Sequence, residues 1–366
     1  MKTVIVAGAT GVVGRAAAER FAASGDWQVI ALSRRPIPAA PNLTPLAVDL
    51  TDREAAAAAL SALPEVTHAV YAALYELPGL VAGWTAPEQM ETNRAMFANF
   101  LDPLAASAPG LRHVSILQGA KAYGGHVHRI SVPEKERRPR DDHPNFYWLQ
   151  EDHLRAAAEG AAWDWTILRP QVVFGGATGS AMNIAPVLGV FAALCAETGR
   201  PFGYPGGPAY LWEAADARLV AKALEWAAEA PAAARETFNI ANGDVADWTQ
   251  LWPSIAEALG AAPASPSPLS LAEWLPAQGA AWARVAARHG LAVPDLAQLL
   301  GESHHYADRI LAHEKAGGAG TRARDPQILS TIKLRQAGFH ACQDTEDMFR
   351  ETFEDLRARR ILPSLD

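Results

Sequence analysis

The chain opens with a short apolar strand pattern that runs directly into closely spaced glycines. Thr3–Ala7 is rich in β-branched residues, and the glycines after it lead into an amphipathic helix pattern at Val12–Ala23. Glycines in this position allow a tight turn and let the amides at a helix N-terminus approach a phosphate. The order of strand, glycine turn and helix therefore predicts a site for the pyrophosphate of a dinucleotide, formed by Gly8, Thr10, Gly11, Val12, Val13 and Gly14.

Strand and helix patterns alternate through the first half of the chain, and one further helix and strand pattern follow later, between residues 215 and 240. Further strand patterns lie at Gln28–Leu32, Leu46–Val48, Ala69–Ala72, His113–Leu117, Trp165–Leu168 and Thr237–Ile240. Helix patterns lie at Arg53–Leu63, Glu88–Ala106, Trp148–Ala158 and Ala215–Ala228. Such alternation indicates βαβ units and a parallel sheet that is covered on both faces. The expected fold class is therefore α/β, a Rossmann-type doubly wound parallel sheet.

The end of the second strand pattern carries the residues that select the cofactor. NAD-binding proteins place an acidic residue there, which binds the ribose 2′-hydroxyl. This chain has Ser33, Arg34 and Arg35 instead. Arginine guanidiniums match the oxygens of a phosphate, so these residues favour the 2′-phosphate of NADPH. The alternative is a pair of solvated loop arginines.

The pattern changes after Pro170. Met182–Gly199 reads as a helix outside the alternation, and helical segments dominate from Asp247 onward. We therefore expect an NADP-binding Rossmann domain at 1–175 and 215–245. A smaller, mostly helical substrate-binding cap region is expected at 176–214 and 246–366.

Composition excludes several classes of protein. The chain has 366 residues, of which 49% are hydrophobic and 20% charged, so it is an ordinary globular chain long enough for two domains. A net charge of −8 argues against nucleic-acid binding. The two cysteines, Cys195 and Cys342, suit a reducing compartment. No apolar stretch reaches the length of a membrane span, so a cytoplasmic protein is expected.

The expected catalytic helix departs from the pattern of short-chain dehydrogenases. Tyr147 is present, but Glu151 stands four residues on, where that superfamily has a lysine on the same helix face. A carboxylate there raises the pKa of a neighbouring phenol, which is the wrong direction for that chemistry. A lysine is found instead at Lys121, just after the fifth strand pattern. Strand ends at the carboxyl edge of such a sheet line the active crevice, so Lys121 can supply the missing charge from the other side.

With these residues the chain resembles the progesterone 5β-reductase/iridoid synthase-like family, an atypical branch of the short-chain dehydrogenase/reductase superfamily. The resemblance spans nearly the whole chain and includes the glycine motif, Arg169-Pro170 and Phe238–Val245. Departures from the plant pattern between Gly125 and His143 make a bacterial-type member the expectation. The resemblance implies NADPH-dependent 1,4-hydride addition to an α,β-unsaturated carbonyl compound, with the enolate stabilised by Tyr147 and Lys121.

The resemblance also implies the remaining contacts. For the cofactor these are Asp49, Leu50, Gln118, Tyr147, Pro170, Val172 and Val173, in addition to the glycine turn and Ser33–Arg35. An alternative role for Asp49 is the N-cap of the helix after Thr51. For the substrate the expected contacts are Phe146, Met182, Asn183 and Trp212.

Two other functions remain open from the sequence. One is an NADPH-dependent carbonyl reductase or an epimerase-like extended short-chain dehydrogenase, and the other is a non-catalytic NADP-binding regulator. No metal is expected, because the spacing of the histidines suits solvated loops better than a metal site (His126, His128, His304 and His305). The expected partner is a small-molecule enone or related carbonyl substrate, with no nucleic acid or membrane, and the expected assembly is a homodimer.

Overall fold

The chain folds into two compact units in a computed structural model that describes residues 2–78, 80–315 and 324–365. The first unit comprises Met1–Val172, Ala217–Ala241 and Leu329–Ala341, and the second comprises Val173–Asp216, Asn242–Ile328 and Cys342–Asp366. Residues 329–341 were expected in the cap region, but they belong to the first unit. They do so because helix α12 (Ile332–Gln336) packs on the last strand of the sheet, where the Lys333 ammonium donates a 2.8 Å hydrogen bond to the Thr237 carbonyl.

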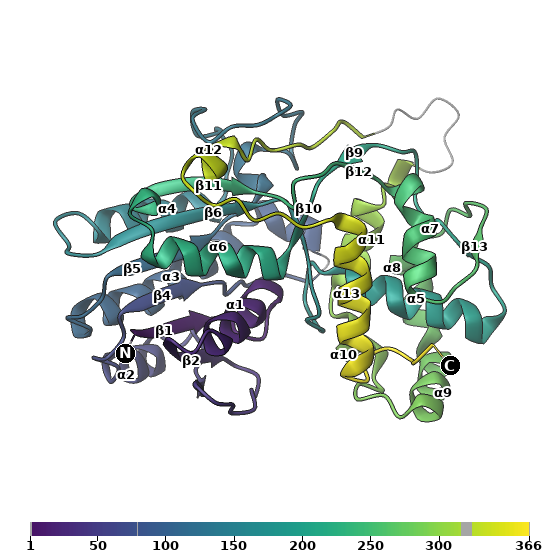
Figure 1. Ribbon diagram of the computed structural model, residues 1–366, viewed down its shortest axis with the longest axis horizontal. Coiled ribbons are helices and arrows are strands. Elements are labelled where there is room, and N and C mark those ends of the chain that lie inside the picture. Colours follow the sequence, from purple (N-terminus) through teal and green to yellow (C-terminus); the bar gives the residue numbers. More distant parts are fainter. Residues whose placement is uncertain (1, 79, 316–323, 366) are drawn as a thin grey trace. The chain divides into compact units, whose positions relative to one another are not determined.

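A seven-stranded parallel sheet forms the centre of the first unit (Figure 1), in the order β11-β6-β5-β4-β1-β2-β3. The strands are β1 (Lys2–Ala7), β2 (Trp27–Ser33), β3 (Leu43–Ala47), β4 (His68–Tyr71), β5 (His113–Leu117), β6 (Asp164–Pro170) and β11 (Glu236–Ile240). The strand order reverses between β1 and β4. Ligands of doubly wound sheets bind in the crevice that such a reversal opens at the carboxyl ends of the strands. The expected fold class is confirmed.

Helices cover both faces of this sheet (Figure 1). Helices α1 (Val12–Ala23) and α6 (Ala217–Glu229) pack against each other on one face. The other face carries α2 (Arg53–Ser61), α3 (Pro87–Ser107) and α4 (Phe146–Ala157), with α3 in contact with both neighbours. This arrangement explains why the strands read as continuous apolar runs rather than as alternating patterns.

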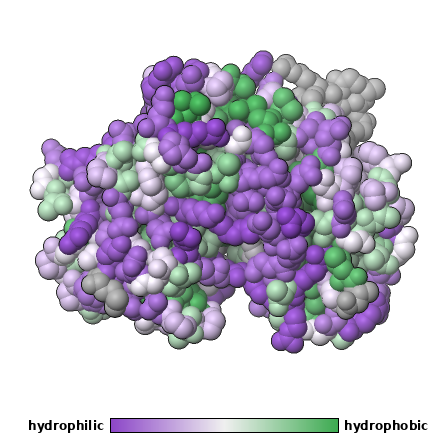
Figure 2. Space-filling view, viewed as in Figure 1, coloured by the Kyte–Doolittle hydropathy of each residue, from purple (hydrophilic) through white to green (hydrophobic). Residues whose placement is uncertain are grey.

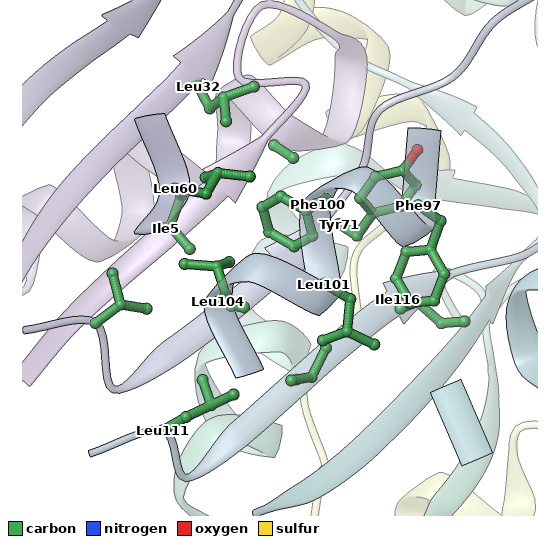
Figure 3. Close-up of a cluster of buried hydrophobic side chains, with 14 of the residues drawn as sticks. Ile5, Leu32, Leu60, Tyr71, Phe97, Phe100, Leu101, Leu104, Leu111 and Ile116 are labelled. Atoms are coloured by element: carbon green, nitrogen blue, oxygen red, sulfur yellow. The ribbon is translucent and has the colours of Figure 1, made fainter. Parts of the chain in front are cut away.

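The core beneath α3 is aromatic (Figure 3). Phe97, Phe100 and Leu104 are fully buried, and the Tyr71 ring packs edge-on to Phe97 with ring centroids 4.9 Å apart. Fully burying one such side chain stabilises the fold by about 1.5–3 kcal/mol. The cluster holds α3 against β4, and so it sets the positions of the loops that follow β4 and β5.

The second unit is mostly helical. Its helices are α5 (Ile184–Thr198), α7 (Trp248–Ala258), α8 (Leu271–Trp274), α9 (Gly279–His289), α10 (Leu296–Leu300), α11 (Ser303–Ile310) and α13 (Thr345–Ala358). Short strands pair as β7 (Val172–Phe174) with β10 (Ala214–Asp216), β8 (Phe202–Gly203) with β13 (Pro263–Ala264), and β9 (Leu211–Trp212) with β12 (Ala246–Asp247). The indoles of Trp212 and Trp248 stack in its core, with centroids 4.1 Å apart.

Polar side chains cover most of the face drawn in Figure 2, over elements of both units. Within the described ranges, no helix has the length and apolar character needed to cross a membrane. Both cysteines are free thiols, Cys195 buried and Cys342 exposed.

Candidate functional site

The glycine turn after β1 packs so closely on neighbouring backbone that side chains at Gly8 and Gly14 would not fit. Gly8 has φ +78°, and a Cβ there would lie 2.6 Å from the Ala72 carbonyl oxygen. A Cβ on Gly14 would lie 2.1 Å from the Gly8 carbonyl oxygen. No side chain caps the N-terminus of α1, where Gly11 is the N-cap, so its amides remain for an anion. The turn therefore fits the pyrophosphate of a dinucleotide.

The residues expected to select the cofactor converge on this turn. The Thr10 and Ser33 hydroxyl oxygens are 2.9 Å apart. The Arg35 guanidinium donates to the Thr10 hydroxyl at 3.2 Å and to the Thr10 carbonyl at 3.1 Å. Burial, and then the neighbouring charge of Arg34, lower the pKa of Arg35 from its usual value. The Arg35 guanidinium thus lies against the dinucleotide turn, and the Arg34 charge acts on both Arg35 and Asp49.

Asp49 does not cap the following helix. Its carboxylate accepts hydrogen bonds from the Thr51 amide at 3.0 Å and the Thr51 hydroxyl at 2.8 Å. The N-cap of α2 is Asp52, so the alternative role for Asp49 is wrong. Burial raises the pKa of Asp49, but the Thr51 hydrogen bonds and the Arg34 charge outweigh it and hold that pKa below its usual value. Leu50 is buried.

Tyr147 lies in the first turn of α4, against the exit of β5. Asn145 is the N-cap, and its side-chain oxygen accepts the Tyr147 amide at 3.0 Å. The phenol ring packs on Phe146 with centroids 4.6 Å apart. The Tyr147 hydroxyl lies 3.4 Å from the position that a Cβ on Gly119 would occupy. The phenol oxygen is therefore held over the carboxyl end of the sheet.

Lys121 lies in the 3-10 turn η2 (Ala120–Tyr123), directly after β5. Its ammonium sits 3.6 Å above the centroid of the Trp84 ring and 3.8 Å from a Glu76 carboxylate oxygen. Its backbone carbonyl accepts the Asn145 side-chain amide at 3.1 Å. Asn145 therefore connects both expected catalytic residues, Tyr147 and Lys121. The Lys121 ammonium lies near the end of β5, as predicted from the sequence.

Glu76 and Trp84 contact the expected catalytic Lys121, and the sequence did not predict either of them. The Glu76 side chain is 5% exposed and accepts a 2.6 Å hydrogen bond from Gln89 on α3. Burial raises the pKa of Glu76 above its usual value, and the Lys121 ammonium and the Gln89 hydrogen bond partly oppose this shift. Neither residue belongs to a periodic pattern or a motif, so nothing in the sequence indicates that they meet Lys121.

Glu151, at the place of the usual lysine, is surrounded by donors. It accepts from Gln118 at 2.9 Å and from Arg155 at 3.0 Å, and Arg169 approaches it at 3.4 Å. Burial raises the pKa of Glu151, but these partners outweigh it and hold that pKa below its usual value. The Gln118 side chain, an expected cofactor contact, is occupied by this network, since its oxygen accepts from Arg169 at 2.7 Å.

The remaining expected contacts are spread over both units. Pro170 ends β6 and Val172 begins β7, whereas Val173 opens the second unit. Met182 is half-buried there. Asn183 is buried and its amide donates to two backbone carbonyls at 2.7 Å each. Trp212 stacks in the core. These contacts show structural roles for Asn183 and Trp212 within the second unit.

The histidines of the loop after η2 are not all solvated as expected. His128 is exposed, but the half-buried His126 packs edge-on to Trp84 with centroids 5.9 Å apart. His304 and His305 lie on α11 with ring centroids 4.3 Å apart. Among the described residues, no group of three or more His, Cys, Asp or Glu side chains is arranged to hold a metal ion.

The chain is similar to named enzymes along most of its length. The family described as PRISE-like Rossmann-fold domain matches residues 5–363. The (S)-8-oxocitronellyl enol synthase CYC2 of Camptotheca acuminata is 32% identical over 381 residues, covering 98% of this chain and 93% of that protein. A 3-oxo-Delta(4,5)-steroid 5-beta-reductase of Arabidopsis thaliana is 35% identical over 277 residues, covering 70% of this chain and 69% of that protein.

Solved structures share the fold at lower identity. The Bordetella bronchiseptica enzyme WbmH, in complex with NAD+, aligns with a TM-score of 0.66 at 15% identity, covering 98% of this chain and 99% of that chain. A UDP-N-acetylglucosamine 4-epimerase from Methanobrevibacter ruminantium aligns with a TM-score of 0.67 at 17% identity, covering 98% of this chain and 99% of that chain. These likenesses concern the fold alone.

Proposed function

Because the chain belongs to the PRISE-like Rossmann-fold family, we propose that it reduces the carbon–carbon double bond of small α,β-unsaturated carbonyl compounds with NADPH. It is an oxidoreductase that uses a nicotinamide dinucleotide. The observation that carries the proposal is the placement of Tyr147 and Lys121 at the exit of β5, while Glu151 replaces the usual lysine. The bacterial-type assignment remains a prediction.

The two catalytic residues stabilise developing negative charge. When bound, the nicotinamide supplies a hydride to the β-carbon of the substrate. The Tyr147 hydroxyl donates a hydrogen bond to the carbonyl oxygen, and the Lys121 ammonium adds positive potential as that oxygen becomes an enolate. One preorganised donor of this kind contributes on the order of 10²–10³ in rate. Trp84 and Glu76 keep the ammonium at the strand exit.

The surroundings of Glu151 favour reduction of the double bond over reduction of the carbonyl. A carbonyl reductase must deliver a proton to the oxygen, and its superfamily does so through a lysine four residues after the tyrosine. Here that position is a carboxylate whose charge is met by Arg155 and Arg169. An enolate needs stabilisation more than an immediate proton, because its carbon accepts a proton from solvent afterwards. Tyr147 and Lys121 meet this requirement, because they stabilise the enolate oxygen without the lysine that delivers a proton in carbonyl reductases.

The product of a simple enone tests the proposal. With NADPH and 2-cyclohexen-1-one, we expect the saturated ketone with the carbonyl retained, measured by gas chromatography. The allylic alcohol as main product would contradict enone reduction and indicate a carbonyl reductase. No NADPH oxidation with any of a panel of enones would indicate the non-catalytic regulator.

We also propose that NADPH is preferred over NADH. Arg35→Ala is expected to weaken NADPH binding by about 1.5–3 kcal/mol, the range for hydrogen bonds to charged groups, because a guanidinium next to the 2′-phosphate is lost. NADH binding should change little, since it has no 2′-phosphate. Isothermal titration calorimetry measures both. Arg20→Ala, at the far end of α1, is the control, and equal wild-type affinities for the two cofactors would refute the preference.

A further inference from the structure

The loop after η2 contains a chain of hydrogen bonds that the proposed function has not used. His128 Nε2 lies 2.9 Å from one oxygen of Asp141, and His143 Nδ1 lies 2.6 Å from the other. His143 Nε2 in turn lies 3.2 Å from the side-chain nitrogen of Asn145. The chain therefore runs from an exposed histidine to the N-cap of the helix that carries Tyr147.

Asn145 is tied to the backbone of both catalytic residues, and this fixes the orientation of its amide. Its oxygen accepts the Tyr147 N–H at 3.0 Å, and its nitrogen donates to the Lys121 carbonyl at 3.1 Å. A backbone N–H only donates and a backbone carbonyl only accepts, so the oxygen and nitrogen of Asn145 cannot exchange places.

The orientation of Asn145 fixes the tautomer of His143. The Asn145 nitrogen only donates, so His143 Nε2 must accept and must carry no proton. The ring proton then lies on Nδ1, which donates to Asp141. A doubly protonated ring would place an N–H donor against the Asn145 donor and break the chain at that point.

We propose that His143, oriented by Asp141, is a positioning residue that holds Asn145, and through it both Tyr147 and Lys121, and that it does so as the neutral tautomer with the proton on Nδ1. The inference rests on the proposed function, because it assigns catalysis to Tyr147 and Lys121. It adds to that site a histidine that acts through Asn145 and sets the positions of Tyr147 and Lys121.

Local packing holds the arrangement in place. The His143 side chain is 6% exposed, and its ring packs edge-on to His126 at 5.1 Å and to Trp148 at 6.2 Å between centroids. Gly124 has φ +74°, and a Cβ there would lie 2.3 Å from His128 Nε2. A Cβ at this position would therefore require the His128 ring to move away from Asp141.

Several titratable or charged groups surround His143. Asp141 contacts it directly and His126 packs against its ring. His128 lies beyond Asp141, and its pKa is raised by the Arg129 carbonyl and by Asp141. Arg140 and Arg169 lie over the Trp148 indole, at 4.7 Å and 5.5 Å from its centroid. The Lys121 ammonium lies over the Trp84 ring, on which His126 also packs.

Two substitutions separate the hydrogen bonds of His143 from its packing. Gln in place of His143 offers an oxygen to Asn145 and an N–H to Asp141 but does not titrate. Phe keeps the ring contacts and makes neither hydrogen bond. We expect His143→Phe to lower kcat by about tenfold to 10²-fold, as for small misplacements of catalytic groups, with the KM for NADPH unchanged.

The pH profile distinguishes positioning from a merely structural role. His143→Gln should retain kcat near neutral pH and lose the fall of kcat that we expect for the wild type on the acidic side. His153→Gln is the matched control. His153 lies on α4, the helix that also carries Tyr147, and forms a similar 2.6 Å contact with the exposed Asp102 of α3. That variant should keep the wild-type profile. Equal kcat in His143→Phe and wild type, or an acidic fall that persists in His143→Gln, would overturn the inference.

A readout that needs no substrate keeps the inference separate from the proposed function. Heteronuclear NMR of the imidazole nitrogens should show His143 protonated at Nδ1 only, near neutral pH. The backbone amides of Gly124 and Tyr147, which donate to Lys121 and Asn145, should shift in His143→Phe and not in His143→Gln. A proton on Nε2, or amides that respond equally to both variants, overturns the inference even in a protein that reduces enones. Failure to reduce any enone contradicts the proposed function while these spectra still decide the role of His143.

Discussion

Replacing Tyr147 with phenylalanine is expected to lower kcat for an enone by on the order of 10²–10³, because the change removes one preorganised donor to the enolate oxygen. The ring and its contact with Phe146 remain, so NADPH binding should be nearly unchanged. Steady-state kinetics with 2-cyclohexen-1-one and calorimetry with NADPH measure the two effects.

Tyr71→Phe is the matched control for this change. The Tyr71 hydroxyl is buried and has no hydrogen-bond partner among the described residues, so its removal should leave both turnover and stability intact. If Tyr147→Phe kept wild-type turnover, the phenol would not be the oxyanion donor and the assignment of this residue would be wrong.

Removing the Lys121 side chain should make stability depend more strongly on pH through Glu76. Burial already raises the pKa of Glu76, and Lys121 is the cation that opposes this shift. In Lys121→Ala the folded-state pKa of Glu76 rises further. Between about pH 4.3, the usual pKa of an unfolded glutamate, and that raised value, the folded chain holds a proton that the unfolded chain has released, so stability falls as pH rises. We expect a loss of about 1–3 kcal/mol at pH 8, below the range for breaking a fully buried pair because Lys121 is partly exposed.

The double variant Lys121→Ala/Glu76→Gln tests this directly. Glutamine keeps the shape and the hydrogen bond from Gln89 but carries no charge, so the denaturant midpoint of the double variant should change less between pH 5 and pH 8 than the midpoint of Lys121→Ala. Lys222→Ala, an exposed lysine on α6, controls for loss of a surface charge. A Lys121→Ala variant whose stability loss is constant over this pH range would show that Glu76 does not carry a buried charge beside Lys121.

Local patterns predicted the sheet and its helices well, and the differences have local causes. The helix Val12–Ala23 and the strand His113–Leu117 lie where the periodicity placed them. Strand β3 runs over Leu43–Ala47 rather than the predicted Leu46–Val48, so it begins earlier and includes Pro45. β3 is an edge strand, where the backbone N–H that proline lacks is not required.

Contacts between distant segments could not be predicted in the same way. Lys121 and Tyr147 were identified because each occupies a place in a motif at a strand end or a helix start. Glu76 and Trp84 reach Lys121 from a loop without periodicity, and His143 reaches Asn145 through a hydrogen bond that depends on ring orientation. Such pairings depend on the folded backbone, which brings together residues that composition and spacing treat as unrelated.

The first unit is closed by a segment from late in the chain, and this bears on the order in which the protein can form during synthesis. The Ser330 amide donates to the Glu134 carbonyl at 2.8 Å, and the Asn239 side chain donates to the carbonyls of both residues. Glu134 lies in the same loop as His128, Asp141 and His143. Domains whose segments are contiguous can fold as they leave the ribosome, N-terminal part first. Here the loop that contains Glu134 lacks the Ser330 hydrogen bond until residue 330 has emerged, although Asn239 is available earlier. A nascent chain that already carries the complete dinucleotide turn and both proposed catalytic donors therefore still lacks this backbone hydrogen bond to the loop beside them.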